Sequence, residues 1–224
     1  MTLLINGQWL TGRGSALIKY DPVSGEVLWQ GHSATEEEVT AACQAAGAAF
    51  GAWSALEFSD RLAVVNRFGK QLEDHQPALT ACSARETGKP RREAASEVTS
   101  MFNKVAISVQ SWHQRTGNSE TPGSSLHHRP HGVMAGFGPY NFPGHLPNGP
   151  IIPALLAGNT VVFKPRELTP PTAQLTPECC HNSGLPAGGS HLPLGGKQTG
   201  PALRAQPSPA GVRFSRRPAT RSLF

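Results

Sequence analysis

Two short segments of this chain combine residue types that could bind or polarise a small molecule. Residues 138–143 read GPYNFP, and the carboxamide of Asn141 lies there in a turn bracketed by prolines, after an apolar run. A second apolar run ends at Lys164, and Glu167 follows three residues later. Because parallel strands end at a common edge of their sheet, this pattern predicts an amide donor beside a lysine–carboxylate pair able to bind ribose hydroxyls.

The same residues also have purely structural interpretations. An Asn such as Asn141 can cap a turn before a helix. A pair such as Lys164 and Glu167 can be a solvated ion pair at a strand end, which contributes under about 1 kcal/mol. The residues alone leave both interpretations open.

Familiar phosphate and metal motifs are missing from the sequence. Gly136 and Gly138 lack the third glycine of a dinucleotide fingerprint, and Lys197 lacks the glycine spacing of a P-loop. The four cysteines show no Cys-x-x-Cys spacing, and the histidines between 113 and 145 are not spaced as metal ligands. We therefore predict no metal site, and any nucleotide must bind by other means.

The positive charge is concentrated in one part of the chain. Residues 176–224 hold six of the 20 Lys and Arg residues and one of the 15 acids, so residues 1–175 hold 14 of each and are neutral. No aromatic residues interleave with the basic ones as in nucleic-acid-binding modules, so we expect no nucleic-acid partner. The N-terminus has no signal-peptide pattern and no run of eighteen apolar residues occurs; a cytoplasmic protein without membrane contact is expected.

The apolar periodicity predicts helices followed by a βαβ rhythm. Thr35 and Glu38 have the spacing of a capping box at the start of the first helix. A parallel sheet should begin near residue 132, which makes the fold class α/β. Residues 176–224 contain seven Pro and seven Gly without a clear period, and we expect them to be poorly ordered. The predicted helices are 35–50, 59–72, 77–87, 91–113 and 145–157, and the predicted strands are 124–131, 132–138 and 160–163.

Four motifs resemble the aldehyde dehydrogenase superfamily over residues 1–175. They are INGQW at 5–9, DPVSGE at 21–26, ETGKP at 86–90 and GPYNFP at 138–143. The resemblance implies a doubly wound parallel-sheet cofactor domain, preceded by helices, with residues 117–132 forming part of a β layer used for homo-oligomerisation. Residues 129–149 look most like the bacterial subgroup that oxidises N-succinylglutamate 5-semialdehyde to N-succinylglutamate in arginine breakdown.

The resemblance also implies roles for individual residues. Asn141 would donate to the oxyanion that forms when a cysteine attacks the aldehyde. Lys164 and Glu167 would bind the adenosine ribose, with Phe137 and Pro139 beside the cofactor. Because the carboxylate of Glu167 would repel a 2′-phosphate, the resemblance favours NAD over NADP.

Residues 176–224 depart from the family pattern. Cys179 and Cys180 do not stand in the sequence context of the family's nucleophile, and no counterpart of its general-base glutamate occurs in the chain. Arg216 and Arg221 stand where relatives have the glycines of a phosphate-binding turn. The alternative expectation is therefore a truncated, catalytically inactive chain or pseudogene product with a degenerate tail.

Overall fold

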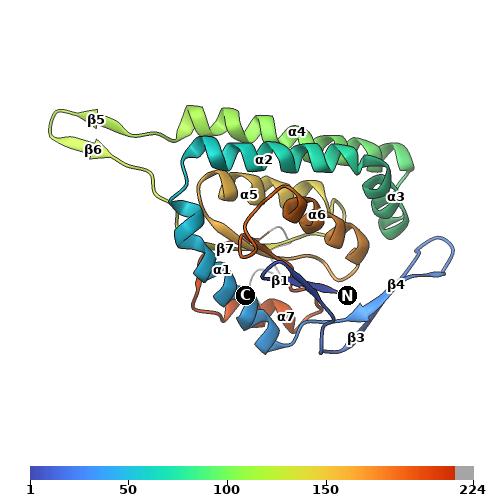
Figure 1. Ribbon diagram of the computed structural model, residues 1–224. Helices are drawn as coiled ribbons and strands as arrows, with labels where there is room; N and C mark the ends of the chain where they lie inside the picture. The colour runs from blue at the N-terminus through green and yellow to red at the C-terminus, as the bar shows by residue number, and fades with distance from the viewer. Residues whose placement is uncertain (215–224) are drawn as a thin grey trace.

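The computed structural model describes residues 1–214, and it folds as helices packed on a parallel sheet (Figure 1). The N-terminal part contains two antiparallel hairpins and four helices. They are β1 (Leu3–Ile5), β2 (Gln8–Leu10), β3 (Ala16–Tyr20), β4 (Val27–His32), α1 (Glu36–Ser54), α2 (Phe58–Asp74), α3 (Gln76–Thr87) and α4 (Arg91–Arg115).

A third hairpin precedes the parallel sheet, in which strands and helices alternate. These elements are β5 (Ser119–Thr121), β6 (Ser124–Leu126), β7 (Val133–Phe137), α5 (His145–Leu156), β8 (Thr160–Lys164), α6 (Pro170–Asn182), β9 (Ser190–His191), α7 (Thr199–Arg204) and β10 (Pro209–Phe214). Strand β6 ends five residues earlier than the sequence predicted, and β5 is an additional strand within residues 117–132.

The parallel sheet has the strand order β10-β7-β8-β9. Strand β7 pairs with β8 and with β10, so that Phe137 lies opposite Lys164 on one side and opposite Phe214 on the other. The chain thus adds β8 and β9 on one side of β7 and then returns to place β10 on its other side. This reversal creates a topological switch point between β7 and β10. The predicted α/β fold with a parallel sheet is confirmed.

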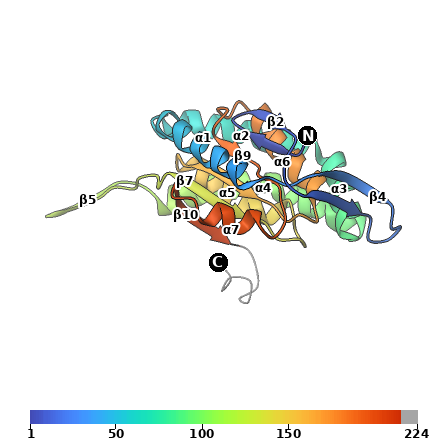
Figure 2. The same ribbon diagram turned by 90° about the horizontal axis from the view of Figure 1, so that it is seen from below.

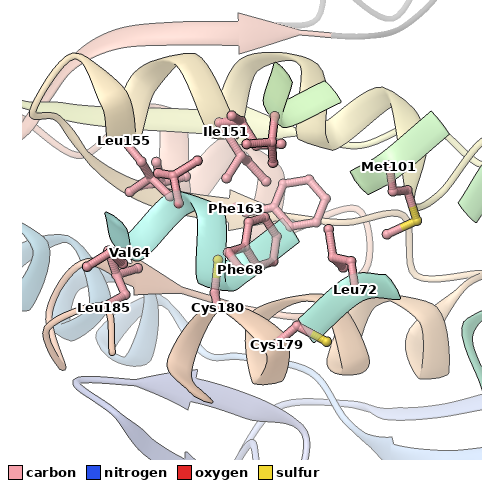
Figure 3. Close-up of a cluster of buried hydrophobic side chains, with 14 of the residues drawn as sticks. Val64, Phe68, Leu72, Met101, Ile151, Leu155, Phe163, Cys179, Cys180 and Leu185 are labelled. Carbon is pink, nitrogen blue, oxygen red and sulfur yellow. The ribbon is translucent and has the colours of Figure 1, made fainter. Parts of the chain in front are cut away.

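Helices cover both faces of the sheet, which explains why β8 is buried along its whole length. Val161 and Phe163 join the core cluster shared with α2, α4, α5 and α6, while Val162 joins the cluster shared with α1 and α7. Figures 1 and 2 show α1 and α7 on the face opposite α2, α4 and α5. The first cluster includes Phe68 at its centre, and Cys179 and Cys180 lie in it (Figure 3).

Local signals in the sequence position the N-terminal helices correctly. Thr35 accepts a hydrogen bond from the backbone N–H of Glu38, and the Glu38 carboxylate accepts one from the N–H of Thr35, as the capping-box spacing predicted. Helix α3 ends at Gly88, whose φ of 73° is the left-handed conformation that glycine adopts without strain. The start of α1 and the end of α3 are therefore set by residues within a few positions of each helix end.

The expectation that residues 176–224 are poorly ordered is wrong for residues 176–214. This segment completes α6 and forms β9, α7 and β10, so the boundary predicted at residue 175 falls inside a helix. Its four leucines at 185, 192, 194 and 203 are buried, and its backbone bonds to earlier segments. Leu192 exchanges hydrogen bonds with Leu4, and Ala34 donates to Leu194. Long-range pairing of this kind leaves no periodic signal in composition. Arg216 and Arg221 lie outside the described residues.

The hairpin of β5 and β6 extends away from the rest of the molecule beyond the end of α4 (Figures 1 and 2). All six of its strand residues are exposed, including Leu126. Within residues 1–214, no helix combines the length and the apolar character needed to span a membrane.

Candidate functional site

The carboxyl ends of β7 and β8 bring the two predicted segments together. Phe137 and Lys164 are register partners, and the backbone N–H of Gly138 donates to the carbonyl of Lys164 at 3.0 Å. The segment that carries Asn141 thus leaves the sheet directly beside the lysine. This edge, next to the switch point, is where open parallel sheets bind their ligands.

Lys164 and Glu167 form the ion pair that their spacing indicated. Nζ of Lys164 lies 3.4 Å from Oε2 of Glu167, and Nε of Arg166 lies 3.2 Å from Oε1 of the same carboxylate. Burial lowers the pKa of Lys164, while the neighbouring Glu167 opposes this shift. The lysine side chain is buried, whereas the Glu167 side chain remains 19% exposed. The carboxylate is therefore held in place and can be reached by a ligand hydroxyl.

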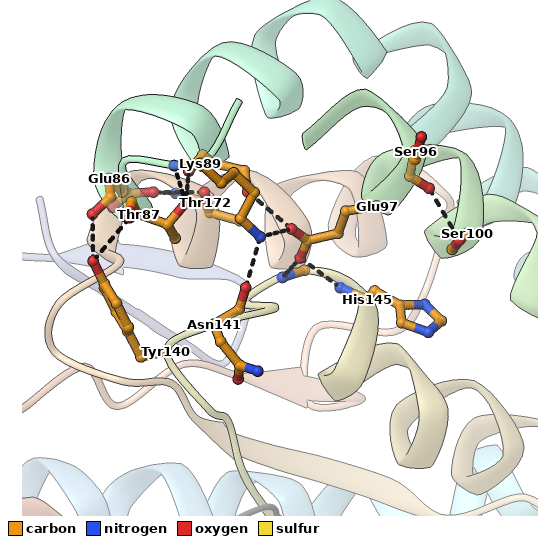
Figure 4. A network of polar contacts seen from close by, with 12 residues as sticks. Glu86, Thr87, Lys89, Ser96, Glu97, Ser100, Tyr140, Asn141, His145 and Thr172 are labelled. Atoms are coloured by element: carbon orange, nitrogen blue, oxygen red, sulfur yellow. Dashed lines mark hydrogen bonds and ion pairs between the residues drawn. The ribbon is translucent and has the colours of Figure 1, made fainter. Parts of the chain in front are cut away.

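Residues 138–144 form a loop between β7 and α5 that carries Asn141. Gly138 begins this loop against the ring of Phe163, where an added Cβ would lie 2.8 Å from the ring and would force the ring or the backbone to shift. Asn141 is exposed, and its carboxamide makes no hydrogen bond with any residue in the described part of the chain. Its backbone carbonyl, in contrast, accepts a 2.6 Å hydrogen bond from Nζ of Lys89. The side-chain amide points away from this contact (Figure 4) and is free to donate.

A buried carboxylate from α4 holds the other end of the loop. Oε1 of Glu97 accepts hydrogen bonds from the backbone N–H groups of Gly144 and His145, at 2.9 and 3.2 Å. Oε2 of Glu97 contacts Nζ of Lys89 at 2.6 Å and accepts a bond from the Ser83 hydroxyl at 3.0 Å. The carboxylate thus caps α5 at its N-terminus, where the helix dipole favours negative charge.

A second buried carboxyl group lies beside the loop. Oε2 of Glu86 accepts bonds from the N–H and hydroxyl of Thr172 in α6, while its Oε1 is buried without a hydrogen-bond partner among the described residues. Burial raises the pKa of Glu86 to about 8, and Lys19 partly opposes the shift. The Tyr140 hydroxyl donates to the backbone carbonyls of Glu86 and Thr87, which ties the loop to the end of α3.

The cysteines do not resemble activated nucleophiles. Cys43, Cys179 and Cys180 are buried and Cys82 is partly buried. Burial raises the pKa of Cys43 and Cys82 to about 11 and that of Cys179 to about 12, and it also raises the pKa of Cys180. Attack on a carbonyl requires a thiolate, so these four thiols are unsuited to that step. Nor does any group of three or more potential metal ligands occur within residues 1–214.

The structure brings all five predicted site residues to one edge of the sheet, but the side chain of one of them is buried away from it. Asn141, Lys164 and Glu167 are arranged as described, and Pro139 is half-buried in the loop between them. Phe137 differs: only 6% of it is exposed, and it belongs to the core cluster beneath the sheet. A ligand at this edge would therefore contact mainly the backbone of Phe137.

The sequence interpretation missed Lys89 and Glu97 as parts of this site. In the sequence, Lys89 stands only as part of the ETGKP motif at the end of a helix. Glu97 carried a usable signal, because it shares the apolar face of α4 with Ala94, Val98 and Met101. A carboxylate on such a face is almost always paired or hydrogen-bonded, but the sequence does not name its partners.

This parallel α/β sheet with a loop amide and an ion pair at its carboxyl edge matches a known class. The model of the aldehyde dehydrogenase family matches residues 9–220, and the chain belongs to that family. It is 55% identical over 220 residues to N-succinylglutamate 5-semialdehyde dehydrogenase of Erwinia tasmaniensis, covering 98% of this chain and 45% of the relative. The Escherichia coli K12 enzyme of the same name is 56% identical over 219 residues, covering 96% and 44%. The chain thus spans a little under half of these relatives.

Solved structures support the same assignment. Aldehyde dehydrogenase C from Pseudomonas syringae, in complex with NAD+ and octanal, superposes with a TM-score of 0.90 at 27% identity, over 95% of this chain and 44% of that one. The NADP-dependent glyceraldehyde-3-phosphate dehydrogenase from Bacillus halodurans, in complex with NADP, gives 0.88 at 26% identity, over 95% and 47%. The predicted resemblance to the superfamily and to the succinylglutamate subgroup is confirmed, and a nicotinamide cofactor is supported.

Proposed function

We propose that this chain provides the dinucleotide-binding edge of an enzyme that oxidises N-succinylglutamate 5-semialdehyde to N-succinylglutamate with NAD. The observation that carries the proposal is the Lys164–Glu167 pair at the carboxyl end of β8, beside the loop that presents Asn141. Relatives that share 55–56% of its residues bear the name of that activity. The small-molecule aldehyde is therefore the proposed partner of this site.

The preference for NAD follows from Glu167. A carboxylate can accept hydrogen bonds from both ribose hydroxyls, whereas it repels a 2′-phosphate. Arg166 contacts the same carboxylate and could weaken that repulsion. Structural relatives use either cofactor, so the balance between Glu167 and Arg166 decides the preference in this chain.

The environment of Asn141 supports its proposed role as an oxyanion donor. Its carboxamide is exposed at the sheet edge while its backbone is held by Lys89. One preorganised donor of this kind can lower the reaction barrier by about 3–4 kcal/mol. The cofactor, when bound, would accept the hydride, and Asn141 would stabilise the negative charge on the carbonyl oxygen.

The remaining expectations concern the whole protein. We propose that it is a cytoplasmic homo-oligomer without a nucleic-acid partner, and that the exposed hairpin of β5 and β6 contributes to the contact between subunits. The thiols described above are unsuited to attack the aldehyde. This favours a cofactor-binding role for residues 1–214 as a whole over a catalytic one.

Isothermal titration calorimetry of the chain with NAD+ and NADP+ tests the proposal. We expect NAD+ to bind more tightly than NADP+, and Glu167→Gln to weaken NAD+ binding by about tenfold, since a hydrogen bond to a charged group contributes about 1.5–3 kcal/mol. Glu73→Gln is the control, because Glu73 pairs with Lys70 on the exposed surface of α2. Absence of binding, or equal effects of the two substitutions, would contradict the proposed site.

A further inference from the structure

One ion pair holds the backbone of the Asn141 loop at two points. Nζ of Lys89 donates to the carbonyl of Asn141, and Glu97 accepts from the N–H groups of Gly144 and His145. Lys89 and Glu97 contact each other at 2.6 Å. The loop residues between these points are thus fixed from both sides by groups outside the loop (Figure 4).

Burial makes this arrangement stiff. The side chain of Glu97 is 1% exposed and that of Lys89 is 12% exposed, so solvent screens their interaction little. Glu97 has four hydrogen-bonding partners, which satisfy both of its oxygens. Lys89 also lies 4.5 Å from the ring centroid of Phe142, a cation–π contact with the residue after Asn141.

The contacts involve the Asn141 backbone and leave its side chain unengaged. A pair that only joined α3, α4 and α5 would have no need to bond the carbonyl of an exposed residue. Fixing that carbonyl limits rotation of the peptide that carries the Asn141 side chain. The position from which the carboxamide donates is thereby restricted before any substrate binds.

We propose that Lys89 and Glu97 are positioning residues that aim the carboxamide of Asn141. This inference rests on the proposed oxyanion role of Asn141. Lys89 sets the orientation of the Asn141 peptide, and Glu97 fixes the start of α5 and holds the Lys89 ammonium in place. Neither residue need touch the substrate.

Nuclear magnetic resonance of the full chain tests this pair directly. The first variant, Lys89→Met, keeps the length of the side chain and removes its charge and hydrogen bonds. Lys89→Arg is the conservative variant, and Lys70→Met is the matched control, because Lys70 forms surface ion pairs with Glu73 and Asp74. Should Lys89→Met fail to fold because Glu97 is left as an unpaired buried charge, the double variant Lys89→Met/Glu97→Gln removes both charges.

We expect Lys89→Met, or the double variant, to shift and broaden the side-chain amide resonances of Asn141. In the double variant, hydrogen exchange at Gly144 and His145 should accelerate by about tenfold or more, because Glu97→Gln removes the charge that accepts from their N–H groups. Lys89→Arg should restore the parent resonances, and Lys70→Met should leave them unchanged.

A purely structural pair would give a different result. The variants would then melt at a lower temperature, but the Asn141 amide resonances would coincide with those of the parent, and that result would overturn the inference. Binding of NAD+ is measured separately, so a failure of the proposed function appears as absent binding with the loop result intact.

Discussion

Asn141 combines a restrained backbone with a free side chain. Its backbone therefore contributes to the stability of the fold, whereas its carboxamide is available for the reaction. Lys89 bonds its carbonyl, while the exposed carboxamide has no partner among residues 1–214. Removing the carboxamide should therefore leave the fold intact. The substitution should instead slow the reaction, at the step in which negative charge develops on a bound carbonyl oxygen.

We predict that Asn141→Ala lowers kcat of the whole enzyme by about 10²–10³, the usual effect of losing one oxyanion donor. The free energy of unfolding should change by less than about 0.5 kcal/mol, as at other exposed sites. Asn118→Ala, at an exposed position before β5, is the control. A large loss of stability in Asn141→Ala, with kcat unchanged, would show that the turn-capping interpretation is correct.

At the scale of elements, His191 joins the first hairpin to the sheet. The backbone N–H of Asn6, in the turn between β1 and β2, donates to Nδ1 of His191, and Nε2 lies 3.0 Å from the carbonyl of Gly188. Nδ1 must be unprotonated to accept, so Nε2 carries the proton and donates. Burial lowers the pKa of His191 to about 4.

This geometry predicts loss of stability in mild acid. The unfolded chain binds the proton near pH 6.5 and the folded chain only near pH 4, so stability should fall as pH decreases between these values. The loss is at most about 3 kcal/mol, at about 1.4 kcal/mol per pKa unit. His191→Gln, which can keep both hydrogen bonds without titrating, should flatten the curve in urea unfolding, while exposed His127→Gln should not. Parallel curves for His191→Gln and the parent would contradict this account.

The raised pKa of Glu86, which joins α3 to α6, predicts the opposite effect of pH on stability. Its pKa is about 4.5 when unfolded and about 8 when folded, so the folded chain holds the proton longer and stability falls as pH rises across this range. The neutral variant Glu86→Gln should therefore gain stability relative to the parent between pH 5 and pH 8, by up to a few kcal/mol. Thermal unfolding at the two pH values measures this gain. An equal difference at both would show that Glu86 does not titrate in that range.

Elements specified by local chemistry could be predicted from the sequence, while those specified by long-range pairing could not. The capping box at Thr35 and the glycine at 88 acted within a few residues, and both helix ends were found. Strand β10 depends on pairing with β7, some seventy residues earlier, and was missed. The ion pair of Lys164 and Glu167 lies within one turn of chain and was predicted. The contact of Lys89 with Asn141 joins residues 52 positions apart and was not.

At the scale of the whole molecule, the two core clusters place the site. One cluster packs α2, α4, α5 and α6 on the sheet and the other packs α1 and α7, so the carboxyl edge of β7 and β8 is fixed from both faces. We propose that a nicotinamide dinucleotide binds at this edge through Lys164 and Glu167. Because this proposal places the dinucleotide at particular residues, an experiment that locates bound NAD+ on the structure can test it.

A titration of the ¹⁵N-labelled chain with NAD+, followed by amide chemical shifts, tests the claim most directly. We expect the largest shifts at Gly138, Lys164 and Glu167, with α2 and the hairpin of β5 and β6 unaffected. Shifts centred on another surface, or none at millimolar NAD+, would contradict it.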